Sequence, residues 1–190
     1  MERWVLLRKG ADFEAIGKKY QISPRLACLI RNRDVIGEEA IERYLNGTIS
    51  DLYDGMLMKD ADKAIDILKE KIAEEKKIRV IGDYDIDGVN ATYILMEGLE
   101  RLGAYVDSDI PDRIGDGYGL NRHLIDRAYD AGIDTIITCD NGIAAANEIA
   151  YGKELGMTII VTDHHEIPFD EIDGEKIYRL SLIHISEPTR

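Results

Sequence analysis

Three short apolar runs in this chain are each followed within two residues by acidic or histidine residues. The runs cover residues 78–81, 135–139 and 158–162, and they are rich in Ile, Val and Thr. Bounded runs of this composition are typical of strands buried in a parallel sheet. The carboxyl ends of neighbouring parallel strands open onto one crevice, where ligands bind. We therefore expect the polar residues after the three runs to meet at one edge of a sheet.

The order of strand-like and helix-like runs predicts the fold class. From residue 78 onward they alternate with short connections, over residues 78–81, 89–102, 105–110, 121–131, 135–139, 144–155 and 157–162. This order favours an α/β fold, in which a parallel sheet is flanked by helices. The earlier part predicts short helices instead, with a start at Ser23-Pro24 and amphipathic patterns over residues 38–45 and 60–76. We expect a helical N-terminal appendage.

Composition narrows the function classes. The chain of 190 residues fits one domain with an appendage, or two small domains. Its net charge of -13 argues against a basic surface that wraps nucleic acid, but not against an acidic metal site that meets phosphate through cations. Cys28 and Cys139 form no Cys-x-x-Cys pattern and are typical of reduced thiols in a cytoplasmic protein. No run approaches the roughly 18 apolar residues of a membrane span, so we expect no membrane association.

The first acidic cluster contains Asp83, Asp85 and Asp87, followed by a glycine. An EF-hand loop needs Glu at its twelfth position, which is Ile94 here, so that interpretation is excluded. A haloacid-dehalogenase-type phosphatase uses an Asp-x-Asp pair after a strand, as in residues 85–89, but its later Lys and acidic pair are hard to place. A solvated turn explains isolated acids. Three acids at alternate positions after a strand favour metal ligands.

The other two clusters strengthen this interpretation. Asp163 precedes His164 and His165, and neutral imidazole and carboxylate both donate to divalent ions. Adjacent residues leaving a strand point to different sides, so one His can ligate a metal while the other faces a phosphate. Asp140 before Asn141-Gly142 is by itself only a turn signal, but it lies between the other two strand ends. Carboxylates crowded in this way need a cation, which indicates hard divalent metals and phosphate chemistry.

A glycine-rich loop is predicted over residues 111–120, after the second strand. Its glycines would let the backbone approach a ligand closely. Arg113 in this loop offers a planar fork for a phosphate. A flexible surface loop without a ligand explains the same glycines equally well.

These motifs resemble a known family. Residues 82–88, 138–143 and 162–166 resemble the first three signature motifs of the DHH phosphoesterase superfamily. Their spacing and the Gly-Tyr-Gly-Leu sequence at residues 117–120 resemble its RecJ branch, the single-strand-specific 5′-to-3′ DNA exonucleases. Two early segments resemble the helical leader of that branch, at residues 22–27 and 50–54.

The resemblance implies metal-dependent phosphodiester hydrolysis in DNA repair and recombination. It implies two Mn²⁺ or Mg²⁺ ions held by Asp83, Asp85, Asp87, Asp140 and His164. Asp140 would bridge both ions. It makes His165 and Asp140 catalytic and places His165 at the scissile phosphate, with Arg113 holding a phosphate of the strand. The implied partners are single-stranded DNA and other repair or replication proteins.

Two other functions compete with this one. A DHH phosphodiesterase for short oligonucleotides or cyclic dinucleotides would usually lack the helical leader. A non-catalytic DHH-like replication scaffold would tend to lose its metal-binding acids.

We expect three segments: a helical leader over residues 1–58, a DHH phosphoesterase domain over residues 59–179, and a tail over residues 180–190. The tail resembles the translation of an adapter used in sequencing libraries, and such scars are excluded from fold arguments. An ordinary C-terminal strand and turn is the alternative. On the adapter interpretation the DHH domain is incomplete, because the family's fourth-motif Asp and substrate lobe would follow later. We then expect this chain to be an inactive fragment.

Overall fold

The computed structural model of the chain describes residues 9–115, 117, 119–172, 175–178 and 183–186. It divides the chain into two compact units, Met1–Asp54 and Gly55–Arg190. Short 3-10 helices lie on either side of this division, at Ile49–Asp51 and Gly55–Leu57. The predicted leader boundary after residue 58 falls just beyond the second of them and stays a prediction.

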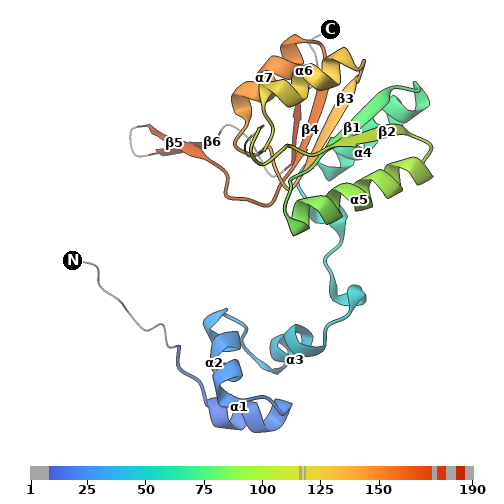
Figure 1. Cartoon of the computed structure of the whole chain (residues 1–190). Helices are drawn as coiled ribbons and strands as arrows, with labels where there is room; N and C mark the ends of the chain where they lie inside the picture. Colours follow the sequence, from blue (N-terminus) through green and yellow to red (C-terminus); the bar gives the residue numbers. More distant parts are fainter. Residues whose placement is uncertain (1–8, 116, 118, 173–174, 179–182, 187–190) are drawn as a thin grey trace. The chain divides into compact units, whose positions relative to one another are not determined.

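The first unit contains three helices, which confirms the helical N-terminal part (Figure 1). They are α1 (Phe13–Tyr20), α2 (Pro24–Asn32) and α3 (Glu38–Asn46). Helix α2 starts as predicted, because the Ser23 side chain accepts a hydrogen bond from the Leu26 amide and proline occupies the first turn. Ala27, Ile30 and Ile41 are buried between these short helices.

The second unit is built around a five-stranded sheet with the order β2-β1-β3-β4-β7. Its strands are β1 (Lys77–Ile81), β2 (Tyr105–Asp109), β3 (Thr135–Cys139), β4 (Thr158–Thr162) and β7 (Ile183–Ser186). Strands β1 to β4 are mutually parallel, and β7 runs antiparallel to β4. Helices α4 (Ala61–Ala73), α5 (Ile86–Arg101), α6 (Arg122–Asp130) and α7 (Ala146–Glu154) flank the sheet (Figure 1). The predicted α/β fold class is therefore confirmed.

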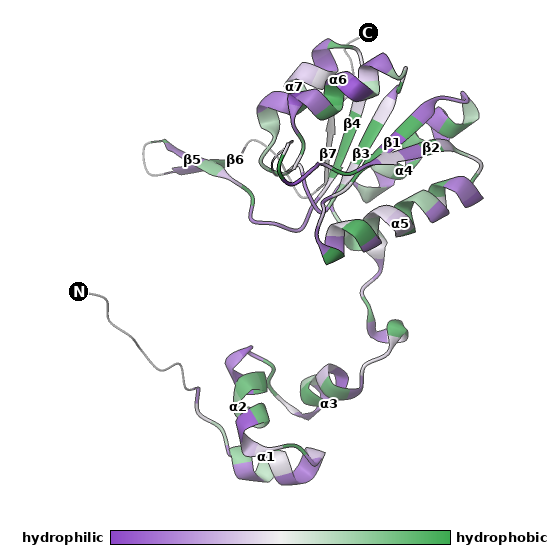
Figure 2. Cartoon of the chain, viewed as in Figure 1, coloured by the Kyte–Doolittle hydropathy of each residue, from purple (hydrophilic) through white to green (hydrophobic). Residues whose placement is uncertain are grey.

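Alternate residues of the central strands face opposite layers, as the period of a strand requires. Ile136 and Ile159 pack in a cluster with apolar residues of α6 and α7. Ile137 and Ile160 pack in a second cluster with residues of α4 and α5. Figure 2 shows β3 and β4 as strongly hydrophobic, whereas the helices carry mixed residues. This two-sided core fixes where each strand ends, and so it positions the polar residues that follow.

Two features of the C-terminal part differ from the simplest expectation. Strands β5 (Phe169–Ile172) and β6 (Glu175–Tyr178) form a separate antiparallel hairpin. The sequence did not indicate it, because its residues are exposed and do not alternate between apolar and polar side chains. Residues 183–186 of the predicted tail form β7, while the rest of residues 180–190 lies outside the described part. The adapter origin of the tail stays a prediction.

Among the described residues, no helix is long and apolar enough to cross a membrane.

Candidate metal centre

The carboxyl ends of three strands lie next to one another. Ile81 of β1 is in register with Thr138 of β3, and Cys139 is in register with Thr162 of β4. The residues after these strands therefore leave the sheet at the same edge. This is the crevice in which parallel α/β sheets bind ligands.

Two sets of possible metal ligands form at this edge, within the described part of the chain. Asp83, Asp85 and Asp140, here called the acid group, have one ligand atom each within 4.8 Å of one another. Asp140, His164 and His165, here called the histidine group, meet the same limit. Asp140 belongs to both groups, which is the arrangement that a carboxylate bridging two ions requires.

Asp83 is the most deeply buried member of the acid group, with 1% of its surface exposed. Its Oδ1 atom is buried and has no hydrogen-bond partner. A buried, unpaired carboxylate oxygen is costly, and a divalent cation would satisfy it. A Cβ on Gly88 would lie 2.6 Å from backbone and Cβ atoms of Asp83, so this glycine lets the first turn of α5 pack onto the ligand.

Asp85 is the N-cap of α5, which begins at Ile86 rather than at the predicted residue 89. One of its carboxylate oxygens accepts hydrogen bonds of 3.0 Å from the amides of Asp87 and Gly88. The other oxygen can bind a metal without uncapping the helix. Asp85 can thus cap α5 with one carboxylate oxygen and serve as a metal ligand with the other.

Asp87 joins neither group in the described structure. Acids at alternate positions share a face only while the chain stays extended. Because Asp87 lies within the first turn of α5, the helical twist separates its exposed side chain from those of Asp83 and Asp85.

Asp140 occupies a strained and buried position at the centre of the site. Its φ of 61° lies in the left-handed region, which costs a non-glycine residue about 1 kcal/mol or more. Burial raises the pKa of Asp140, and the Asp85 carboxylate adds to this, while the hydrogen bond with His164 lowers it. A neighbouring cation would favour the charged form, as expected for a metal ligand.

Asn141 holds the strand ends beside Asp140. Its Nδ2 atom donates to the carbonyl oxygens of Ile81 at 3.1 Å and Cys139 at 3.2 Å. The Thr138 hydroxyl donates to the Asn141 carbonyl oxygen at 2.8 Å, and the Thr162 hydroxyl donates to the Thr138 carbonyl oxygen at 2.7 Å. These bonds join β1, β3 and β4 at the edge that carries the ligands.

The two histidines of the group have different partners. His164 Nε2 lies 2.7 Å from Asp140 Oδ1, so these two possible ligands are hydrogen-bonded to each other. His165 Nδ1 lies 2.7 Å from Asp163 Oδ1 and 4.0 Å from Asp140 Oδ1. The contact with Asp163 therefore fixes Nδ1 of His165, so that Nε2 faces away from Asp163.

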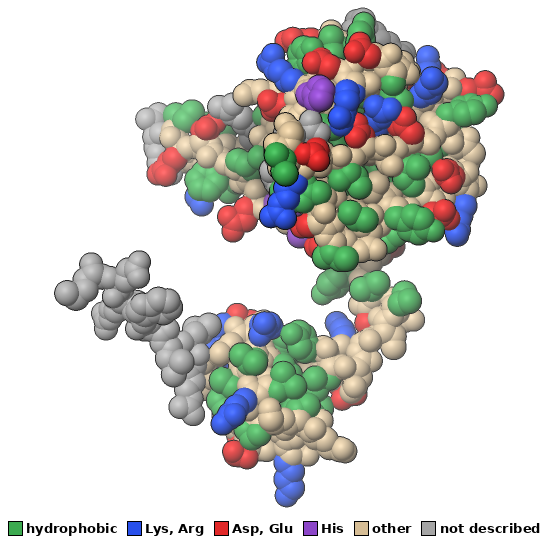
Figure 3. All heavy atoms as spheres, in the orientation of Figure 1, with side chains coloured by type: hydrophobic (Ala, Val, Ile, Leu, Met, Phe, Trp, Pro, Cys, Tyr) green, Lys and Arg blue, Asp and Glu red, His purple; other side chains and the backbone are tan. Residues whose placement is uncertain are grey.

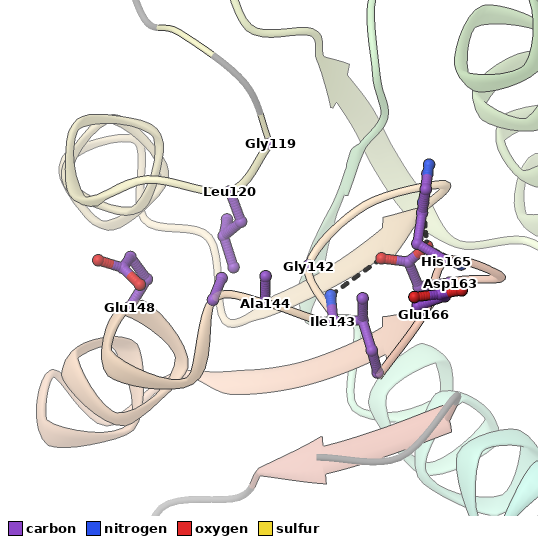
Figure 4. A pocket seen from close by; sticks show the side chains of 10 residues that line it. Gly119, Leu120, Gly142, Ile143, Ala144, Glu148, Asp163, His165 and Glu166 are labelled. Carbon is purple, nitrogen blue, oxygen red and sulfur yellow. Dashed lines mark hydrogen bonds and ion pairs between the residues drawn. The ribbon is translucent and has the colours of Figure 1, made fainter. Parts of the chain in front are cut away.

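Asp163 is a residue to which sequence reasoning gave no separate role. Its carboxylate also accepts hydrogen bonds from the amides of Ile143 at 2.9 Å and His165 at 3.1 Å (Figure 4). Burial alone would raise the pKa of Asp163, but these three hydrogen bonds together lower it. The side-chain hydrogen bond between Asp163 and His165 is the main reason why the pKa of His165 is raised. In the sequence, the position of Asp163 directly before the two histidines was the signal that could have indicated this role.

A pocket of about 350 Å³ opens beside His165 (Figure 4). Its walls are mostly small or apolar, and they come from the loop before α6, the loop before α7 and the segment after β4. The lining residues are Gly119, Leu120, Gly142, Ile143, Ala144, Ala145, Glu148, Asp163, His165 and Glu166. A substrate bound there would be in contact with the histidine group.

Arg113 lies outside both ligand groups, on the exposed loop after β2. Its guanidinium carbon is 5.3 Å from the centre of the Tyr84 ring. Tyr84 stands between Asp83 and Asp85, so this contact links the loop to the acid group. Sequence reasoning predicted Arg113 but did not predict Tyr84.

Comparison with known proteins identifies the family. Residues 77–185 match the DHH family, N-terminal domain. This chain belongs to the DHH family. The predicted resemblance is thereby confirmed, including its RecJ branch. As a DHH-family chain it is 36% identical over 187 residues to the single-stranded-DNA-specific exonuclease RecJ of Bacillus subtilis (strain 168), covering 98% of this chain and 23% of that protein. It is 31% identical over 173 residues to RecJ of Escherichia coli (strain K12), covering 90% and 29%.

Solved structures of RecJ are also similar to this chain. A crystal structure of exonuclease RecJ bound to manganese matches 58% of this chain and 29% of its own, with 39% identity and a TM-score of 0.55. RecJ in complex with Mn²⁺ from Thermus thermophilus matches 87% of this chain and 23% of its own, with 27% identity and a TM-score of 0.58. The chain spans about a quarter of the length of the curated relatives named above.

Proposed function

We propose that this chain carries the metal-binding part of a phosphodiesterase that degrades single-stranded DNA as a 5′-to-3′ exonuclease. The observation that carries the proposal is the pair of ligand groups sharing Asp140, beside the unpaired buried oxygen of Asp83. The similarity to proteins named single-stranded-DNA-specific exonuclease supports the substrate, and the RecJ structures with manganese support the metal.

The ligand groups suit two Mn²⁺ or Mg²⁺ ions. Asp83, Asp85 and Asp140 offer carboxylate oxygens, which both ions accept, while the imidazole of His164 favours Mn²⁺ at the second position. Divalent ions bound there would supply Lewis acidity, which makes water a better nucleophile and stabilises negative charge on phosphate. Asp87 stays a proposed ligand, and it can serve only if the first turn of α5 rearranges.

The remaining residues are proposed to act on the substrate. Asp163 orients His165, so that its Nε2 can donate a proton to a phosphate oxygen. The raised pKa of His165 favours the protonated ring that such a hydrogen bond needs. Figure 3 shows acidic and basic side chains intermingled on the visible face of the second unit. This distribution supports recognition of phosphate through metal ions and single cations such as Arg113.

Neither competing function gains support from a specific observation. The helical leader, which short-oligonucleotide phosphodiesterases usually lack, is present. Both ligand groups keep their acids, which disfavours a non-catalytic scaffold. By extension we propose a cytoplasmic role in DNA repair and recombination, with repair or replication proteins as partners.

Calorimetric titration with Mn²⁺ tests the metal centre. We expect two ions per chain for the wild type, and loss of both in Asp140→Asn because this residue serves both groups. Asp130→Asn makes the same charge change at an exposed position at the end of α6 and should bind like the wild type. Binding that is unaffected by Asp140→Asn would refute the proposed centre.

A chimera tests the activity. Residues 77–185 would replace the matching segment of Bacillus subtilis RecJ. The chimera should degrade 5′-labelled single-stranded DNA with Mn²⁺ and leave duplex DNA intact, and the same chimera with Asp140→Asn should be inactive. A folded, Mn²⁺-binding chimera without exonuclease activity would contradict the proposed function.

A further inference from the structure

We propose that Tyr84 is a positioning residue, which holds the guanidinium of Arg113 beside the acid group so that it can receive a phosphate of the substrate strand. The inference rests on the proposed function, because it takes a nucleic-acid phosphate as the group that Arg113 binds. It adds that Tyr84, between two members of the acid group, restrains the Arg113 side chain in the loop after β2.

The backbone on both sides of Tyr84 is held in place. On one side Asp83 is packed against Gly88, and on the other Asp85 caps α5. Tyr84 is itself half-buried, unlike the exposed Arg113. The contacts that build the acid group therefore also fix the backbone from which the Tyr84 side chain projects.

The guanidinium of Arg113 lies over the face of this ring. The separation of 5.3 Å is within the roughly 6 Å range of cation–π contacts. A guanidinium stacked on an aromatic face keeps the N–H donors of its planar fork directed outward, where they can bind a phosphate. Stacking thus restrains the long side chain without using the groups that recognise the ligand.

Arg113 also differs from the arginines nearby in its lack of a carboxylate partner. Arg79 donates to Asp107, and Arg127 donates to both carboxylate oxygens of Asp109. Within the described residues, no carboxylate lies at ion-pair distance from Arg113. This is notable in a chain with 37 acidic and 24 basic residues.

The acid next to Arg113 has a separate function. Asp112 Oδ1 accepts hydrogen bonds from the amides of Ile114 at 2.9 Å and Gly115 at 2.7 Å, which stabilise the turn. Its carboxylate therefore serves the loop backbone. The guanidinium is left to the aromatic ring, with its charge available to an anion.

Removing the ring should loosen Arg113 without disturbing the metal ligands. An exposed cation–π contact corresponds to about a two- to fivefold change in affinity. Any aromatic six-membered ring supplies the contact, so Tyr84→Phe should behave like the wild type. Tyr84→Ala should weaken phosphate binding by this factor while Mn²⁺ affinity stays the same.

A double-mutant cycle tests the proposal. The probe is a 5′-phosphorylated tetrathymidylate, titrated into the 190-residue chain saturated with Ca²⁺ so that binding is measured without turnover. The variants are Tyr84→Ala, Tyr84→Phe, Arg113→Ala and the combination of Tyr84→Ala with Arg113→Ala. If Tyr84 acts through Arg113, the double variant binds no more weakly than Arg113→Ala alone, and Tyr84→Phe restores wild-type affinity. Additive losses, or unchanged affinity in Tyr84→Ala, would overturn the positioning role.

A structural readout separates this proposal from the proposed function. In NMR spectra, ring currents should shift the Arg113 side-chain resonances upfield in the wild type and in Tyr84→Phe, but not in Tyr84→Ala. Absence of the shift in the wild type would refute the contact, whatever the chain binds. Failure of the wild type to bind Mn²⁺ would refute the proposed function instead. Loss of Mn²⁺ binding in Tyr84→Ala alone would show a merely structural role and overturn the inference.

Discussion

Asp134 precedes β3 and Asp140 follows it, so these two carboxylates mark the opposite ends of one strand. Asp134 has a cation of the protein as its partner, with Lys71 Nζ at 2.8 Å. Burial alone would raise the pKa of Asp134, but hydrogen bonds from Lys71 and Thr135 lower it below the ordinary value. At the other end, burial and the Asp85 carboxylate raise the pKa of Asp140.

The difference separates a structural end of the sheet from a binding end. The amino end of β3 is satisfied by the chain itself. The carboxyl end gathers Asp83, Asp85 and Asp140, and within the described residues no Lys or Arg forms an ion pair with any of them. A divalent cation bound at this end would neutralise the carboxylate cluster, as the proposed function requires.

The largest effect is expected from Gly88→Ala at the binding end. The new Cβ would lie 2.6 Å from Asp83, so α5 must shift or the acid group must open. We expect a loss of about 2–3 kcal/mol in the free energy of unfolding, measured by urea denaturation, together with loss of Mn²⁺ binding. Gly98→Ala is the matched control in the same helix, where a Cβ meets nothing within 4 Å. It should stabilise the protein by about 0.5–1 kcal/mol.

Asn141→Ala should have the next largest effect. It leaves the carbonyl oxygens of Ile81 and Cys139 without their side-chain donor in a buried place. We expect a loss of about 2 kcal/mol in urea denaturation. Asn147→Ala, at an exposed position in α7, should stay within about 0.5 kcal/mol of the wild type. Equal stability of the two variants would show that Asn141 does not hold the strand ends.

Asp163→Asn should separate the phosphate-facing histidine from the metal ligands. The variant keeps the shape of the side chain but weakens its hold on His165, while the acid group and His164 keep their contacts. Calorimetry with Mn²⁺ should therefore show both sites unchanged. Because His165 is proposed to face the substrate phosphate, the exonuclease activity of the chimera should fall about 10- to 100-fold. Weakened Mn²⁺ binding would mean instead that His165 holds a metal ion.

The smallest effect is expected from Lys71→Met at the structural end. Because the pKa of Asp134 is lowered in the folded state, its ion pair stabilises the protein fully above the ordinary Asp pKa. This contribution is lost as the pH falls through the lowered value. Thermal unfolding at neutral pH should show a loss of about 0.5–1 kcal/mol in the variant. At about pH 2 to 3 the difference from the wild type should shrink, and a constant difference would show that charge is not responsible.

Local sequence patterns predicted the strands and their polar ends. Residues 135–139 were delimited correctly because the central strand is buried on both faces, which demands a continuous apolar run. The placement of Asp83, Asp140 and His164 at one edge of the sheet followed from the geometry of parallel strands. The positions that sequence reasoning missed depend on exact backbone direction. Asp87 lies in the first turn of α5 because this helix begins at Ile86, three residues before the predicted start, and Asp87 as a metal ligand stays a prediction.

Other features depend on contacts that sequence spacing does not encode. Tyr84 meets Arg113 because β1 and β2 are neighbouring parallel strands, so the residues that follow them leave the sheet side by side. Asp163 supports His165 through a local hydrogen bond that its spacing alone does not distinguish from direct metal ligation. The β5–β6 hairpin has no apolar face buried against the sheet, so no periodic pattern marks it.

Strand β2 forms one border of the five-stranded sheet. A border strand presents unpaired amides and carbonyls that invite β-addition by another molecule, and charged side chains discourage it. Asp107 and Asp109 lie on this strand, each within an ion pair. Removing both charges, as in the double variant Asp107→Asn with Asp109→Asn, should raise the turbidity of concentrated solutions, because copies of the chain could then pair along this border.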